Sequence, residues 1–245
     1  MKKALIIQVR AEDEAADEEY GAFLRFGDLI EEEVERVRAE QHDLTLLDPH
    51  DYTLVIVGGG PFNISDPIEK KTSTQQRIER EIKNIMQVIV EDDLPYFGAC
   101  YGLGILADTL NAPISKEKYS EEVGAVVIEK NSATHDRLLD DLPDKFKAFV
   151  GHKEAAQALP EGCVLLASSA SCPIQMIRAK KNIYGLQFHP ELDTDGLILR
   201  INTYKYAGYF KPEEADSLIK RVKKEQVTEP TSILKKFIDI YHHQI

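Results

Sequence analysis

The sequence predicts an α/β protein, built on an open, mostly parallel sheet with helices on both faces and extended by C-terminal helices. Three observations favour this fold class. Short apolar runs, typical of buried parallel strands, alternate with amphipathic helical patterns in the first half of the chain. A strand-rich stretch follows, and only helices are expected from Asp195 onward. In such sheets, reactive side chains lie at the carboxyl ends of the strands.

The first elements follow from apolar spacing. Leu5–Val9 is a predicted strand, and the acidic run Glu12–Glu19 is expected to be a solvated loop that leads into a helix. Apolar residues from Tyr20 to Val37 recur at helical spacing, with an interruption at Gly27. Leu44–Leu47 is a candidate for a second short strand.

The clearest strand of the first half is Tyr52–Val57, which runs into Gly58-Gly59-Gly60-Pro61, a sharp backbone turn. Ser73 and Gln76 fit a capping box at the start of a long amphipathic helix. The later elements are, in order, a strand at 95–99, a helix at 102–110, and strands at 123–128, 146–150, 164–167, 174–178 and 183–188.

Two helices are predicted near the C-terminus. Pro212 suits the first turn of a helix at 213–224, and Thr231 is a candidate cap for a last helix with an apolar stripe. We therefore expect one domain at residues 1–208 and a helical extension at 209–245.

Composition excludes several classes of function. The 245 residues carry a net charge of −12, and positions 1–50 account for −8 of it. This charge disfavours binding to nucleic acid or to an anionic membrane. Three cysteines without metal-ligand spacing predict neither a disulfide framework nor a metal site, and no organic cofactor motif is present. No apolar run fits a signal or a membrane span, so a cytoplasmic protein is expected.

The segment Phe97-Gly98-Ala99-Cys100-Tyr101-Gly102 joins a predicted strand to a predicted helix. Its G-x-C-x-G pattern is that of a nucleophile elbow, with sulfur in place of oxygen. The positive end of the helix dipole would favour the thiolate of Cys100. Cys100 is therefore a candidate nucleophile, and a buried, inert cysteine is the alternative.

A second motif, Phe188-His189-Pro190-Glu191, follows the last predicted strand. His189 would stand at the strand end, and Glu191 could accept a hydrogen bond from one of its ring nitrogens. A nucleophile, a base and an orienting carboxylate form a triad that is recognised by roles and not by chain order. Alone, His189 could equally be a structural residue at a strand end.

Taken together, Gly59-Gly60-Pro61, the cysteine elbow and Phe188-His189-Pro190-Glu191 resemble the signatures of the class I (triad) glutamine amidotransferases. The resemblance covers roughly residues 1–205. It is greatest to the glutaminase domain of GMP synthetase and to stand-alone proteins similar to it. It implies the flavodoxin-like fold of that family.

The resemblance also implies roles. Cys100 would attack the side-chain amide of glutamine and form a γ-glutamyl thioester, with His189 as proton carrier and Glu191 as its orienting partner. The backbone N–H groups of Gly60 and Tyr101 would form the oxyanion hole. The positions expected to contact substrate are Gly59, Gly104, Gly151, His152 and Lys153.

Two positions depart from the family pattern. Gly104 stands where C-x-G-x-Q has a glutamine, so that side-chain contact to substrate is missing. Lys153 and Glu154 follow His152 where the family has a glycine-containing segment. One alternative is that Lys153 or Glu154 binds a substrate whose α-carboxylate and α-amino groups are arranged differently, or a larger γ-glutamyl compound. The simpler interpretation is that both side chains point into solvent. Arg10 could face the site, although a surface salt bridge is the simpler expectation for it as well.

Three functions are compatible with these residues. The first is hydrolysis of glutamine, or of a related γ-glutamyl amide, with ammonia passed to a synthetase on a separate chain. The second is a γ-glutamyl hydrolase or peptidase on the same fold, which Gly104 favours. The third is a non-catalytic binding module, against which the intact Cys100, His189 and Glu191 argue. The C-terminal helices would cover their own domain, dock a partner, or form a homodimer.

Overall fold

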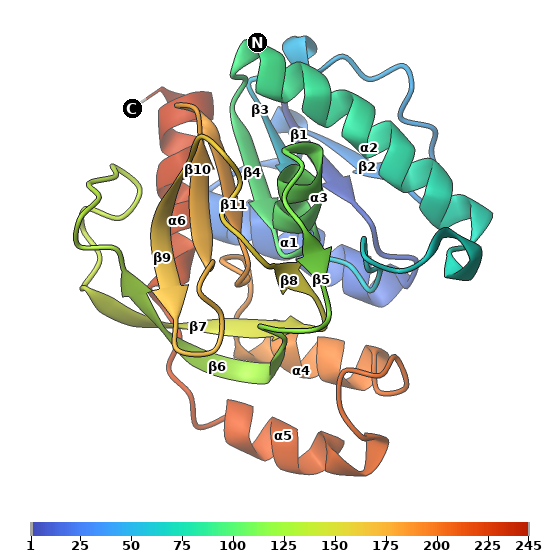
Figure 1. The fold of residues 1–245 in the computed structure, drawn as a ribbon, viewed down its shortest axis with the longest axis vertical. Helices are drawn as coiled ribbons and strands as arrows, with labels where there is room; N and C mark the ends of the chain where they lie inside the picture. The colour runs from blue at the N-terminus through green and yellow to red at the C-terminus, as the bar shows by residue number, and fades with distance from the viewer. Residues whose placement is uncertain (1, 245) are drawn as a thin grey trace.

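A computed structural model describes residues 2–244 and contains a nine-stranded mixed sheet (Figure 1). Five neighbouring strands are parallel, in the spatial order β2 (Val34–Arg38), β1 (Ala4–Gln8), β3 (Leu54–Val57), β4 (Tyr96–Ala99) and β11 (Ile183–Leu186). The sheet continues with four antiparallel strands, β10 (Met176–Ala179), β9 (Cys163–Ser169), β6 (Glu121–Lys130) and β7 (Lys145–His152). A two-stranded ribbon, β5 (Ile114–Ser115) with β8 (Ala155–Ala156), lies outside it.

Helices cover both faces of the sheet, which confirms the predicted fold class (Figure 1). One face packs against α1 (Asp13–Gly27) and α6 (Pro230–Ile238), and the other packs against α2 (Ser73–Asp92) and α3 (Tyr101–Thr109). A third apolar cluster joins β7 to α4 (Thr194–Thr203) and α5 (Ala215–Val222). Short 3₁₀ turns occur at 31–33, 49–51, 68–70 and 212–214, and a π-helical turn follows α6 at 239–243.

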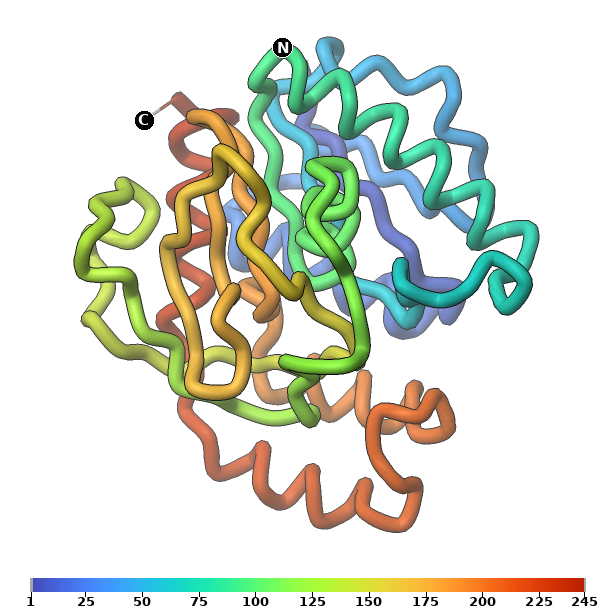
Figure 2. The backbone as a smooth tube through the Cα atoms, viewed as in Figure 1, coloured from blue at the N-terminus to red at the C-terminus, as the bar shows by residue number. Residues whose placement is uncertain are grey.

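The C-terminal helices cover their own domain. Phe237 of α6 is fully buried, and its ring centre lies 5.0 Å from that of Phe97 on β4 and 5.9 Å from that of Tyr184 on β11. Figure 2 shows that the two ends of the chain lie at the same end of the molecule, whereas α5 lies at the opposite end. None of the helices within residues 2–244 is long and apolar enough to cross a membrane.

The second strand of the chain was wrongly predicted. The helix expected to continue to Val37 ends at Gly27, because Asp28 adopts a left-handed conformation with φ of 57°. Val34–Arg38 then pairs in parallel with β1 as an edge strand, and Leu44–Leu47 lies in a turn region. Alternating charges suit an edge strand, since they discourage pairing with other chains, and they also imitate a helical surface.

Two further boundaries differ from expectation. The capping box is formed by Thr72 and Gln75, one residue before the predicted pair, with Thr72 Oγ1 accepting from Gln75 N at 3.2 Å. The acidic run at 12–19 is helical and not a loop, because α1 begins at Asp13. Most of its acidic side chains are exposed, as expected of a solvated face, but Glu19 is completely buried.

Candidate active site

The residues of the site follow the ends of four adjacent parallel strands. The segments that follow β1, β3, β4 and β11 carry Arg10, the glycines at 58–60, Cys100 and His189, respectively. These strands are neighbours in the sheet, so their carboxyl ends meet at one edge, where ligands bind in open α/β sheets. The sequence-predicted loops therefore do come together.

Cys100 lies on a tight turn between β4 and α3. Its φ of 51° and ψ of −95° are unfavourable for a residue with a side chain. Its backbone N–H donates to Leu186 O at 2.7 Å, which joins the turn to the end of β11. A Cβ on Gly98 would lie 2.6 Å from Gly102 C, and one on Gly102 would lie 2.5 Å from Val57 O. The small residues on either side of Cys100 are therefore required by close backbone contacts.

The Cys100 thiol is half-buried in this turn. Desolvation in the enclosed site raises its pKa to about 12, so the thiol is neutral in the free protein at physiological pH. Gln187 Nε2 lies 3.9 Å from Sγ, close enough for a weak donor interaction with the sulfur.

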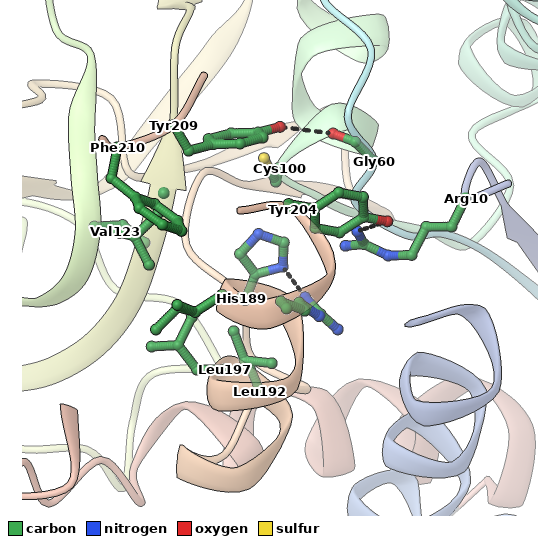
Figure 3. A pocket seen from close by; sticks show the side chains of 14 residues that line it. Arg10, Gly60, Cys100, Val123, His189, Leu192, Leu197, Tyr204, Tyr209 and Phe210 are labelled. Atoms are coloured by element: carbon green, nitrogen blue, oxygen red, sulfur yellow. Dashed lines mark hydrogen bonds between the residues drawn. The ribbon is translucent and has the colours of Figure 1, made fainter. Parts of the chain in front are cut away.

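His189 is oriented by two groups. Its Nδ1 lies 2.9 Å from Glu191 Oε1, and Arg200 Nη1 donates to the same carboxylate oxygen at 3.1 Å. The 3.2 Å approach of Nη1 to Nδ1, drawn as a dashed line in Figure 3, results from this convergence. With its proton on Nδ1, the imidazole has a free Nε2 lone pair. Cys100 and His189 line the same cavity (Figure 3).

Burial and charge set the protonation of this pair. Desolvation lowers the pKa of His189 and outweighs the opposing attraction of Glu191, so the ring is neutral. Burial acts to raise the pKa of Glu191, but the interaction with His189, including its hydrogen bond, and the positive charge of Arg200 outweigh it and hold that pKa far below its ordinary value. The site therefore contains a permanent carboxylate beside a neutral imidazole.

Arg10 faces the site and is not on the surface, contrary to the simpler expectation. Its Nε donates to Glu19 Oε1 at 2.9 Å in a buried ion pair, and its Nη1 donates to Tyr204 OH at 3.1 Å. Glu19 also accepts from Gln8, and Glu18 lies 3.5 Å from Arg200 Nη2. Part of the acidic run thus neutralises two arginines of the site.

The glycine-rich turn after β3 fits closely around these groups. A Cβ on Gly59 would lie 2.5 Å from His189 Cε1, and one on Gly60 would lie 2.8 Å from Val9 O. The Gly60 carbonyl accepts a long hydrogen bond of 3.4 Å from Tyr209 OH. Tyr101 N lies in the first turn of α3, where backbone N–H groups have no partner within the helix.

Two cavities meet at Cys100, Gly60 and Tyr209. The first, which we call the polar cavity, is lined by Tyr101, Gly104, His152, Lys153, Glu154 and Gln187, and also by Phe62, Asn63, Ile114, Ala155 and Ala156. The apolar cavity, shown in Figure 3, is lined by His189, Val123, Leu192, Leu197, Ile201 and Phe210, and also by Arg10, Arg200 and Gly151. Gly104, His152 and Lys153 therefore share one cavity, whereas Gly151 borders the other and Gly59 packs against the His189 ring.

Lys153 and Glu154 do not point into solvent, so that interpretation was wrong. Lys153 Nζ donates to Ala207 O at 3.0 Å and lies over the Tyr209 ring. Glu154 accepts from Ile64 N at 2.7 Å and from Ser65 N and Oγ at 2.9 and 2.6 Å. The two residues line the polar cavity and thus fasten two separate segments of the chain beside it.

His152 belongs to a buried polar network. Its Nε2 lies 2.8 Å from Glu121 Oε2, which also accepts from Gln175 Nε2 at 2.6 Å. Glu121, His152 and Cys172 have ligand-type atoms within 4.8 Å of one another, the spacing of a metal site. Because the Glu121 carboxylate already accepts these hydrogen bonds, the group is accounted for as a structural network that joins β6, β7 and the turn before β10.

Sequence reasoning missed three residues of the site. Arg200 stands on the apolar face of α4 between Leu197 and Ile201, and a charge at such a position is a recognisable signal. Gln187 is buried and stands directly before the histidine motif. Tyr209 lies in the turn region between α4 and α5, and its sequence gives no signal of its position over Cys100.

Comparisons with known proteins agree with this geometry. The family model for glutamine amidotransferase class-I matches residues 25–196. One subunit of a glutamine-hydrolysing GMP synthase from Methanosphaera stadtmanae is 34% identical over 139 residues, which are 56% of this chain and 64% of that protein. A glutamine-hydrolysing GMP synthase from Thermosipho melanesiensis is 29% identical over 155 residues, 63% of this chain and 26% of that protein.

Solved structures share the fold at low sequence identity. A glutamine amidotransferase from Thermotoga maritima superposes with a TM-score of 0.77 at 19% identity and covers 98% of both chains. A glutamine amido transferase from Methylobacillus flagellatus gives a TM-score of 0.72 at 16% identity, over 98% of this chain and 95% of that one. The chain thus spans about a quarter of the Thermosipho synthase and under two thirds of the Methanosphaera protein.

Proposed function

Because the chain belongs to the class-I glutamine amidotransferase family, we propose that it hydrolyses a γ-glutamyl amide through Cys100, His189 and Glu191. One observation carries the proposal. A strained cysteine elbow and a carboxylate-oriented histidine stand at the ends of the adjacent strands β4 and β11. This is the relation between nucleophile, base and orienting group that acyl transfer requires.

The first step is removal of the thiol proton. A thiol with a raised pKa is a poor nucleophile until a base accepts its proton. His189 is neutral and therefore able to accept it at Nε2, while Glu191 stabilises the imidazolium that forms. Cys100 then attacks the γ-carbonyl carbon, and the imidazolium returns its proton to the departing nitrogen.

The oxyanion requires donors that are already in position. Tyr101, at the start of α3, and Gly60, in the glycine turn, both line the polar cavity together with Cys100, which supports their backbone N–H groups as these donors. Removal of one such donor typically lowers turnover by about 10²–10³. The γ-glutamyl thioester that results is hydrolysed by water, with His189 acting as base a second time.

The polar cavity binds the glutamyl end of the substrate. Lys153 supplies a cation there for the α-carboxylate, and burial lowers the pKa of its ammonium group. Gly104 offers no side chain, and a Cβ at that position would lie 3.0 Å from Ile64 Cδ1. In the polar cavity, Lys153 therefore replaces the contact to substrate that the glutamine side chain of the C-x-G-x-Q pattern makes in other members of the family.

Release of ammonia to a separate synthetase is one use of this chemistry. The similarity to one subunit of a GMP synthase supports a two-chain arrangement, in which a different chain would carry the acceptor reaction. The second candidate function is a stand-alone γ-glutamyl hydrolase, which Gly104 favours because the family's glutamine side chain is missing at that position.

The direct test is trapping of the acyl-enzyme. Wild-type protein is incubated with glutamine, or with a glutamine-like electrophile, and its intact mass and peptides are measured beside Cys100→Ala. A γ-glutamyl or electrophile adduct on Cys100, with glutamate released only by the wild type, is expected. Absence of any adduct at Cys100 with glutamine, with a panel of γ-glutamyl amides and with the electrophile would refute the proposal.

A further inference from the structure

The apolar cavity has no role in binding the glutamyl group, and we propose that it holds an apolar substituent on the amide nitrogen. The preferred substrates are then γ-glutamyl amides of apolar amines or amino acids, and unsubstituted glutamine is a poor substrate. This inference rests on the proposed function and adds the class of the leaving group to it.

The positions of His189 and Tyr101 decide which part of the substrate each cavity holds. His189 gives its proton to the departing nitrogen, so the leaving group must lie next to that ring. His189 lines the apolar cavity, whereas Tyr101, a candidate oxyanion donor, lines the polar one. Cys100 and Gly60 border both. The acyl group thus occupies the polar cavity, and whatever is bonded to nitrogen projects into the apolar cavity.

The lining of the apolar cavity does not suit ammonia. Val123, Leu192, Leu197, Ile201 and Phe210 come from four separate segments of the chain and surround the space beside His189 (Figure 3). Ammonia is small and polar and gains nothing from such walls. A hydrocarbon or aromatic group gains free energy in proportion to the apolar area that it buries.

Aromatic residues from one segment close this cavity. Tyr204, Tyr209 and Phe210 all belong to the turn region after α4, and all three line the cavity. Lys153 holds that segment through Ala207 O at 3.0 Å and lies 4.3 Å from the centre of the Tyr209 ring. The residue that faces the glutamyl end thus also fixes the wall that would contact the leaving group.

Two sources could supply such a substituent, and Arg10 distinguishes them. The Nε and Nη1 groups of Arg10 are occupied by Glu19 and Tyr204, so a carboxylate on a ligand in this cavity would have to pair with Nη2. An apolar amino acid would offer such a carboxylate, and an apolar amine would not. Both place the same apolar group beside Val123 and Phe210.

The reaction balances without a further reagent. The Cys100 thiolate forms a C–S bond to the side-chain carbonyl carbon of the glutamyl group, the C–N bond at that carbon breaks, and the nitrogen takes the proton held by His189 to leave as a free amine. Water then attacks the thioester, which yields glutamate and returns the thiol. The products are one glutamate and one amine or amino acid for each water consumed.

The test compares kcat/KM for glutamine, γ-glutamyl-methylamide, γ-glutamyl-phenethylamide and γ-glutamyl-phenylalanine. One added methylene in a hydrophobic pocket is worth about 10–200-fold in specificity. We therefore expect the two phenyl-bearing substrates to exceed glutamine by at least about 10-fold. A higher value for the phenylalanine conjugate than for the phenethylamide assigns the substituent to an amino acid, and the reverse assigns it to an amine.

Substitutions in the apolar cavity test whether the preference for phenyl-bearing substrates depends on it. Val123→Phe fills the cavity and should lower the ratio of kcat/KM for the phenethylamide over glutamine by about 10-fold. Val127→Phe, on the same strand but with a side chain that is 47% exposed, is the matched control and should leave that ratio unaltered. Should Val123→Phe fail to fold, Phe210→Ala enlarges the cavity and is expected to lower the same ratio.

Failure of this inference is distinct from failure of the proposed function. Formation of a γ-glutamyl adduct on Cys100 from glutamine, with no advantage for any substituted amide, would overturn the cavity assignment and leave the hydrolase intact. Equal effects of Val123→Phe on glutamine and on the phenethylamide would overturn it as well. Absence of an adduct from every substrate and from the electrophile refutes the proposed function itself.

Discussion

The ammonium group of Lys153 lies 4.3 Å from the centre of the Tyr209 ring and donates to Ala207 O at 3.0 Å. One side chain at the end of β7 thereby holds the segment that passes over Cys100. The contact joins two positions 56 residues apart in sequence, and both border the polar cavity. Lys153 is therefore coupled to both substrate binding and the shape of the site.

Replacement of Lys153 by methionine should raise KM for the best substrate by about 10-fold or more, with a smaller effect on kcat. A hydrogen bond to a charged group is worth about 1.5–3 kcal/mol, which is the basis of this figure. Steady-state kinetics measure it, and Lys147→Met, which removes a surface ion pair with Glu225, is the control. A lower kcat at constant KM would mean that Lys153 acts only by holding Tyr209.

Activity should depend on pH through His189. Desolvation lowers its pKa below the ordinary value of 6.5, so the ring loses its basic function only at a pH lower than that value. The acid limb of kcat/KM is therefore expected below 6.5. Stopped assays across the acid range measure it, and an acid limb above that value would contradict the assigned environment of His189.

Alkylation of the free protein reports on Cys100. Because its pKa is raised to about 12, the thiolate fraction is small at neutral pH and increases as the pH rises. The rate of modification by iodoacetamide should therefore continue to rise through the alkaline range without a plateau near neutrality. Peptide mapping separates Cys100 from Cys163 and Cys172. A plateau at neutral pH would indicate a thiolate–imidazolium pair in the resting site.

Replacement of Cys100 by glycine should relieve the backbone strain at this position. A side chain held at φ of 51° and ψ of −95° costs on the order of 1–3 kcal/mol. Cys100→Gly is thus expected to have a free energy of unfolding about 1 kcal/mol above that of Cys100→Ala, although neither should turn over substrate. Urea denaturation measures the difference. At Cys163, within β9, the order should be reversed, because glycine weakens a strand.

Glu191→Gln should lower kcat by about 10³–10⁴, since an amide in this place favours the wrong histidine tautomer. It also removes the negative charge that lies 3.1 Å from Arg200 Nη1, which leaves Glu18 and Glu19 as the carboxylates paired with that arginine. Glu18→Gln removes a carboxylate on the other side of Arg200 and should cost less than about 10-fold. Comparable losses for both variants would show that charge near Arg200, and not the orientation of His189, controls turnover.

Acid stability should depend on Glu121. Burial acts to raise its pKa, but hydrogen bonds from His152 and Ser171 outweigh burial and lower it below 4.5. A carboxyl with a lowered pKa in the folded state stabilises the protein above its unfolded value, and the contribution is lost as pH falls through the folded value.

Glu121→Gln should therefore lower the free energy of unfolding by about 3 kcal/mol at neutral pH, and by progressively less in acid. Urea denaturation at several pH values measures the difference. Glu122→Gln, at an exposed neighbouring position, is the control. A constant difference across pH would exclude the carboxylate charge as the cause.

The sequence was most informative where geometry is local. The elbow at Cys100 and the strand end at His189 are fixed by residues within two or three positions, and the structure brings both to one edge. The edge strand at 34–38 was missed because its charged residues match a helical surface, and only pairing with β1 decides its conformation.

Long-range contacts were beyond such reasoning. Arg10 and Glu19 form their ion pair because α1 passes over the end of β1, and Arg200 reaches Glu191 from α4. Tyr209 covers Cys100 through a turn whose path depends on Lys153. None of these contacts leaves a periodic pattern in the sequence, because each depends on how separate helices and strands pack together.

The packing of α6 against β4 and β11 has a consequence for synthesis of the protein. The ribosome makes residues 230–238 after every strand of the sheet, so Phe97 and Tyr184 lack their aromatic partner while that segment is still in the exit tunnel. Exposed aromatic surface on a nascent chain is a target for chaperones and a cause of aggregation. A nascent chain that ended before α6 would therefore present the back of its own active-site strands to the quality-control machinery of the cell.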